Sequence, residues 1–224
     1  MNKIAPLAVL APLAFAGFNT MESNLEAISG NNTQFRGVTN LMGALLPKIN
    51  KYGCWCYFDS DHGKGKSQPV DDVDAICKML HEGYECAILD AEEAGEECVP
   101  WEADYDAAAA GFETIVEECQ VRNADKSACS INACIVEQWF IVSVFQSFIG
   151  GNQHREDYLH VNGFDTDSEC PTSKGAASDH SCCGLYPFRH PFKTYGGARS
   201  CCGSKTYDNS ILSCCGDEKV RLSC

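Results

Sequence analysis

The sequence predicts a mainly α-helical, disulfide-rich fold followed by a small irregular or β module that is also bridged. Three observations support this fold class. The chain of 224 residues holds 16 cysteines, an even number far above ordinary usage. Several stretches have apolar residues at helical spacing. Beyond residue 165, short segments built around cysteine doublets replace these stretches.

Four segments account for the predicted helices. Apolar residues at three/four spacing over 33–49 predict an amphipathic helix, which packs on the core or touches a lipid surface. Pro69 suits a first helical turn, and helical spacing continues from there to Ile88. Residues 112–119 predict a short helix. Residues 129–149 are apolar on most sides, so they predict a buried helix.

Residues 1–16 have the pattern of a signal peptide. Lys3 gives a positive start, residues 4–15 are mostly apolar, and Ala14 and Ala16 form a small-x-small cleavage site. The apolar run is too short for a membrane span, although it also suits an apolar first helix. Together with the cysteine content, it predicts a secreted, extracellular protein.

Charge and cysteines divide the chain near residue 165. The net charge of −14 argues against a nucleic-acid partner, which needs basic patches. Residues 17–164 carry 9 Lys/Arg and 24 Asp/Glu, whereas residues 165–224 carry 7 of each. Eight cysteines lie on each side of the boundary. The sequence therefore predicts two separately bridged domains, 17–164 and 165–224.

The stretch 51–87 carries the residues best suited to chemistry. Cys54 and Cys56 precede a loop rich in Gly, Lys and Asp, and the helix that follows carries His81 beside Glu82. A loop of this kind offers backbone oxygens, the ligands that a hard cation prefers. A histidine next to the cation can activate water.

Glu137 is the one charge within the apolar segment 129–149. Its helical neighbours Phe140, Ile141 and Val144 are apolar, so an unpaired carboxylate there is costly. Two interpretations stay open: Glu137 pairs with His81, or it reaches solvent beside Gln138.

Two further stretches each have two interpretations. The acidic stretch 90–106 carries eight carboxylates and no Lys or Arg, so it is a solvated surface or a weak calcium site. Residues 186–195 alternate aromatic and basic side chains, as in a recognition strip or in internal packing. This strip lies among three Cys-Cys-Gly repeats, at 182–184, 201–203 and 214–216. Because neighbouring cysteines rarely bond each other, each doublet is expected to reach two other partners.

Residues 52–56 (YGCWC), 69–74 (PVDDVD), Cys77 and 81–84 (HEGY) together resemble the secreted phospholipase A2 superfamily. The resemblance covers roughly residues 33–150. It implies calcium-dependent hydrolysis of the sn-2 ester of glycerophospholipids at a membrane surface or micelle. The Cys-Cys-Gly repeats resemble galaxin-type extracellular proteins, which implies matrix attachment or a protein partner.

The resemblance implies a site but leaves its register open. In the implied site, His81 takes a proton from water and Glu137 orients the imidazole. The implied Ca²⁺ ligands are the carbonyls of Trp55, Tyr57 and Asp59, with the Glu82 carboxylate. An ungapped alignment on Asp74, Cys77 and Tyr84 instead puts Leu80 and His81 at the positions of the family's His and Asp. The chain is then a catalytically inactive relative that binds lipid, calcium or protein.

Overall fold

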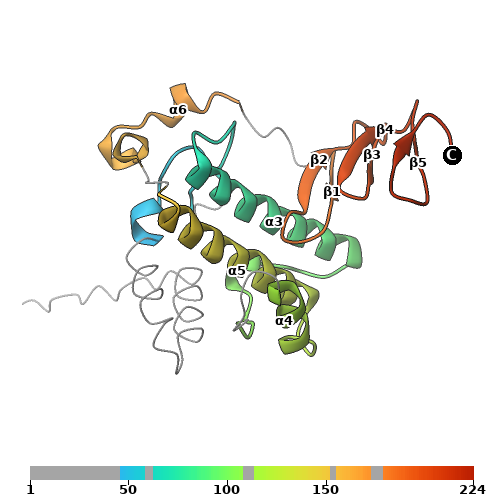
Figure 1. The fold of residues 1–224 in the computed structure, drawn as a ribbon, viewed down its shortest axis with the longest axis horizontal. Helices are drawn as coiled ribbons and strands as arrows, with labels where there is room; N and C mark the ends of the chain where they lie inside the picture. The colour runs from blue at the N-terminus through green and yellow to red at the C-terminus, as the bar shows by residue number, and fades with distance from the viewer. Residues whose placement is uncertain (1–45, 59–62, 108–113, 152–154, 173–178) are drawn as a thin grey trace, which may run out of the picture.

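The computed structural model describes residues 46–58, 63–107, 114–151, 155–172 and 179–224 (Figure 1). Two long helices, α3 (Asp72–Ala94) and α5 (Ala128–Ile149), lie side by side and run in opposite directions. The predicted signal peptide and most of the segment 33–49 fall outside the described residues, and only 46–49 of that segment are seen as helix.

Helix α3 begins later than Pro69 and ends later than Ile88. Asp71 is its N-cap, and the Asp71 side chain accepts a hydrogen bond from the Asp74 amide at 2.9 Å. At the other end, Gly95 adopts the left-handed conformation that commonly closes a helix. An aspartate cap three residues before Asp74 therefore sets the start, and Pro69 stays in the preceding loop.

Helix α5 confirms the prediction of a buried apolar helix. Val136, Phe140 and Val144 are fully buried against α3 and the segment 46–58. By length and composition, its residues 128–148 would suffice to cross a membrane, yet 61% of that apolar window is buried inside the protein. A core helix of this kind gives the same pattern.

Short helices complete the first part of the chain. The 3₁₀ helix η2 (Pro100–Glu102) and helix α4 (Ile115–Arg122) follow α3, and α4 packs on α5. After α5 come η4 (Glu156–Tyr158), η5 (His160–Asn162) and α6 (Thr166–Glu169). The predicted helix 112–119 is thus found as α4, shifted toward its C-terminal end, with 112–113 outside the described residues.

The C-terminal part is a row of three antiparallel hairpins (Figure 1). The first pairs β1 (His180–Cys183) with β2 (His190–Lys193), and the second pairs β3 (Arg199–Cys202) with β4 (Lys205–Asp208). The third pairs β5 (Ser213–Cys214) with β6 (Val220–Arg221). The expectation of a small, bridged β module is confirmed.

All 16 cysteines are bridged, and the bridges correct one prediction. Cys54–Cys170 and Cys86–Cys182 both cross residue 165, so the two cysteine sets are not bridged separately. Equal cysteine counts on the two sides do not reveal this, because an even number of crossing bridges leaves both counts even. The remaining bridges are Cys56–Cys77, Cys98–Cys129, Cys119–Cys134, Cys183–Cys201, Cys202–Cys214 and Cys215–Cys224. Each doublet reaches two other partners, as expected.

A polar anchor fixes the first hairpin to α3 beside the bridge Cys86–Cys182. Asp90 accepts two hydrogen bonds from the Arg189 guanidinium, at 2.7 and 2.9 Å, and a third from the Tyr186 hydroxyl at 2.9 Å. The internal-packing interpretation of the strip 186–195 is therefore confirmed for part of it, and the recognition strip stays a prediction. Tyr186 and Arg189 are packing contacts, whereas Phe188 and Tyr195 are 61% and 63% exposed.

We expect Asp90→Asn to lower the free energy of unfolding by about 1–3 kcal/mol, since a partly buried guanidinium loses its charged partner. Thermal unfolding under non-reducing conditions measures the loss. Asp157→Asn is the matched control, because its ion pair with Arg155 is exposed and its loss should be smaller. Equal losses in the two variants would contradict the anchoring role.

Candidate functional site

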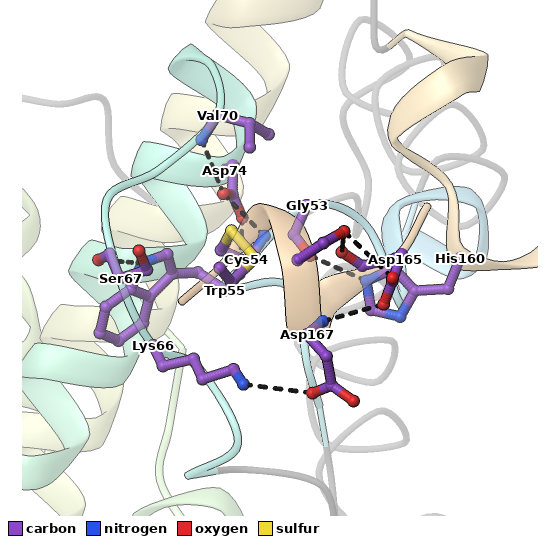
Figure 2. Close-up of a disulfide and its surroundings, with 12 residues drawn as sticks. Gly53, Cys54, Trp55, Lys66, Ser67, Val70, Asp74, His160, Asp165 and Asp167 are labelled. Carbon is purple, nitrogen blue, oxygen red and sulfur yellow. Dashed lines mark hydrogen bonds and ion pairs between the residues drawn. A yellow bond between two sulfur atoms is a disulfide. The ribbon is translucent and has the colours of Figure 1, made fainter. Parts of the chain in front are cut away.

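The Asp74 carboxylate organises the loop that precedes α3. One of its oxygens accepts hydrogen bonds from the amides of Cys54 at 2.9 Å and Val70 at 3.0 Å, and the other accepts from the amide of Trp55 at 2.7 Å (Figure 2). Asp74 is fully buried, and this burial raises its pKa to about 6 although the three amides oppose the shift. The carboxylate thus joins both ends of the loop to the first turn of α3.

Two disulfides and a histidine hold the same loop from its other sides. Cys56 is bonded to Cys77 of α3, and Cys54 is bonded to Cys170 just after α6. The Nε2 atom of His160 lies 2.8 Å from the carbonyl oxygen of Gly53 (Figure 2). Segments far apart in the sequence therefore meet at residues 53–56.

Position 53 requires glycine because of its backbone conformation and the closeness of Asp74. Its φ is +57°, and a Cβ atom there would lie 2.5 Å from the Asp74 carboxyl carbon. A side chain at this position would therefore displace the carboxylate that holds the loop.

His81 is fully buried in α3, with both ring nitrogens enclosed. Its ring lies against the ring of Trp55, with 6.1 Å between centroids. Trp55 is 4% exposed, and its indole N–H donates to the Ser67 carbonyl at 3.1 Å. Trp55, whose backbone carbonyl the resemblance implies as a calcium ligand, thus covers part of the histidine with its side chain.

Glu137 is fully buried in α5, which excludes the interpretation that it reaches solvent. Its two carboxylate oxygens accept hydrogen bonds from two tyrosine hydroxyls, that of Tyr84 at 2.6 Å and that of Tyr105. Burial raises the pKa of Glu137 to about 7, against the opposing effect of the two hydroxyls. The described partners of this carboxylate are neutral donors.

Glu82 lies on a different face of α3 from His81. Its carboxylate is 3.6 Å from the ammonium of Lys78, and Lys78 lies 5.4 Å from the centroid of Trp55. These three side chains line a cavity of about 220 Å³ together with Ser67, Gln68, Glu85, Thr172, His180 and Pro191. Glu82 therefore faces a cavity that the first hairpin helps to close.

The calcium site that the resemblance implies stays a prediction, because only part of it lies within the described residues. The Trp55 carbonyl accepts a hydrogen bond from the Tyr57 amide at 2.7 Å, and Glu82 is paired with Lys78. Asp59 lies outside the described residues. Within the described parts of the chain, no three His, Cys, Asp or Glu side chains are arranged to hold a metal ion.

The two hydrogen bonds to Glu137 had no clear signal in the sequence. Tyr105 lies in the acidic stretch 90–106, where nothing in its neighbours indicates a partner on α5. Tyr84 occupies an apolar position of α3, and only the cost of burying Glu137 suggests that its hydroxyl is needed. The sequence places Asp74 near a helix N-terminus. Its hydrogen bonds to the amides of Cys54 and Trp55 were not predictable, because they form only when the loop folds back onto the helix.

Comparison of the sequence with known proteins found no match. No family model matches the chain, and no curated protein matches its sequence. The dense bridging is typical of extracellular proteins.

We expect the stability of the protein to fall as pH rises through the pKa of Glu137. The folded pKa, about 7, lies above the ordinary value of 4.5, so the folded state binds the proton more tightly than the unfolded state does. The stabilisation is complete below about pH 4.5 and is lost by about pH 7, an effect on the order of 3 kcal/mol.

Guanidinium unfolding at several pH values, with disulfides intact, measures this slope. Glu137→Gln should flatten it, leaving the smaller contribution of Asp74, whose raised pKa acts in the same direction. Glu117→Gln, at an exposed position on α4, should leave the slope unchanged. An unaltered slope in Glu137→Gln would show that Glu137 titrates normally.

Proposed function

We propose that this chain is a secreted, phospholipase A2-like protein that acts by binding an extracellular partner and does not hydrolyse phospholipid. The observation that carries the proposal is the fixed register of α3. Asp74 binds the loop, Cys77 is bonded to Cys56, and Tyr84 donates to Glu137, all from one unbroken helix.

These three residues are the ones on which the ungapped alignment rests. In that register, Leu80 and His81 occupy the positions of the family's His and Asp. The other register, which matches His81 and Glu82 to the dyad, leaves Asp74 and Tyr84 without counterparts. The contacts made by Asp74 and Tyr84 therefore favour the register in which the dyad is lost.

The surroundings of the candidate residues also favour a catalytically inactive protein. Leu80 is 1% exposed and cannot transfer a proton. Glu82, the one carboxylate among the implied metal ligands with described contacts, is paired with Lys78. A protein with this loop and without calcium chemistry can still present a rigid, bridged surface to a partner. The exposed C-terminal hairpins, with their galaxin-like repeats, are the part best suited to it.

Calcium-dependent hydrolysis is the second candidate function, and one observation favours it. His81 and Glu137 are both fully buried, on the two helices that form the core. A histidine and a carboxylate kept out of water in this way are what a general base and its orienting group require. In this case, the loop carbonyls, together with residues outside the described parts, would supply the calcium ligands.

We expect no fatty-acid release from zwitterionic or anionic phospholipid vesicles, with or without millimolar calcium. Calorimetry should detect no calcium binding at the loop. Titration of the released fatty acid measures this for the wild-type protein and for His81→Gln. His190→Gln, on β2, is the control histidine variant. Calcium-dependent release that survives in His190→Gln and disappears in a folded His81→Gln would establish the hydrolase instead.

A further inference from the structure

The C-terminal hairpins form an open groove of about 670 Å³ that the candidate site does not use. Its walls come from the second hairpin, the turn that precedes it, and Leu212 and Val220 at the third hairpin. The side chains that matter for recognition are Tyr195, Arg199, Lys205, Thr206 and Tyr207. All five carry a hydrogen-bond donor, and Asp208 is the one carboxylate in the lining, so donors outnumber charged acceptors in the groove.

The positive charge of this groove is only partly compensated. Arg199 donates through Nε to the Thr206 hydroxyl at 3.0 Å and lies opposite Asp208 in the β3–β4 pair. That aspartate already accepts hydrogen bonds from the amide and the hydroxyl of Ser210. Lys205 is exposed and forms no ion pair within the described parts of the chain. The groove therefore offers one uncompensated cation beside a guanidinium.

Tyr195 stands at the edge of the groove in a conformation that few residues adopt. Its φ is +50°, in the left-handed region, and its side chain is 63% exposed. Strain of this kind persists where the surrounding structure imposes it, often at binding sites. Here the next two residues, Gly196 and Gly197, also have positive φ, and the turn they form places a large aromatic ring in solvent.

The same chain carries a surface of opposite charge. Glu92, Glu93, Glu96 and Glu97 are all exposed at the C-terminal end of α3, and none forms an ion pair with another described residue. The last turn of α3 contains no basic residue. Carboxylates at this end of a helix are unfavourable because the helix dipole is negative there, so a cation supplied from elsewhere stabilises them.

We propose that the groove binds the acidic end of α3, residues 92–97, of a second copy of this chain. Lys205 and Arg199 pair with the glutamates, and the hydroxyls of Tyr195 and Tyr207 donate to the remaining carboxylate oxygens. The charged residues that line the groove are Arg199, Lys205 and Asp208, two cations and one carboxylate, whereas residues 90–106 carry eight Asp/Glu and no Lys or Arg, so the two surfaces are complementary in charge.

The contact joins two different surfaces, so it is heterologous. When two copies bind, one keeps a free groove and the other keeps a free acidic end, so repetition of the contact gives chains that stay open unless the rotation between copies closes a ring. Such chains are a means of multivalent attachment outside the cell. This inference does not depend on whether the protein hydrolyses lipid.

Sedimentation velocity over a range of concentrations at physiological salt tests the contact. Wild-type protein should show an average mass that rises with concentration. Arg199→Glu/Lys205→Glu and Glu96→Lys/Glu97→Lys should each weaken self-association by at least about tenfold. An equimolar mixture of the two variants should recover it, because every reversed groove then meets a reversed acidic end.

Matched controls separate this contact from a general effect of charge. Lys193→Glu lies on β2 outside the groove, and Glu117→Lys/Asp125→Lys changes exposed carboxylates elsewhere, so both should associate as wild type does. The proposal is overturned if the wild type stays monomeric, if mixing restores nothing, or if the controls lose association equally. It is also overturned if the groove variant loses binding to a sulfated polysaccharide while self-association is unchanged. Melting curves confirm that each variant is folded.

Discussion

The register of α3 is the constraint on which the rest of the structure depends. The helix contacts the loop through Asp74 and Cys77, helix α5 through Tyr84, and the first hairpin through Cys86 and Asp90. A rise of 1.5 Å per residue sets Asp74 and Asp90 about 24 Å apart on one rod. Each partner is therefore fixed at its own level of the helix, and a shift of one residue would break all of these contacts together.

The two buried carboxylates show what kind of environment this rod creates. Asp74 is held by three amides and Glu137 by two hydroxyls, all of them neutral donors. Neutral donors satisfy the lone pairs but do not offset the loss of hydration of the charge, so both pKa values rise. Both groups therefore favour folding more strongly when they are protonated. In a catalytic dyad, a protonated imidazole beside Glu137 would favour the ionised form of this carboxylate.

The sequence predicted the local features well and the long-range ones poorly. Helical periodicity located α3 and α5, and the cysteine doublets predicted the bridged hairpins, because these signals lie within a few residues of the element they describe. The partner of Glu137 was not predictable in this way. Tyr105 reaches it from an acidic stretch that is remote in sequence, so only the folded chain brings the two together. The crossing bridge Cys86–Cys182 was missed because charge and cysteine parity both indicated a boundary that the bridges do not respect.

The same geometry explains why the doublets work as connectors. Consecutive side chains along a strand point to opposite faces, so the two cysteines of a doublet are directed toward different parts of the protein. Cys182 bonds back to α3 and Cys183 bonds forward to Cys201, and the doublets 201–202 and 214–215 continue the pattern. The first two hairpins are thus each tied once to the preceding unit and once to the following one, whereas the third is tied to the second through Cys202–Cys214 and to its own C-terminal segment through Cys215–Cys224. Because the bridges supply the stability, a hairpin can leave its polar and aromatic side chains exposed, which is what a binding surface requires.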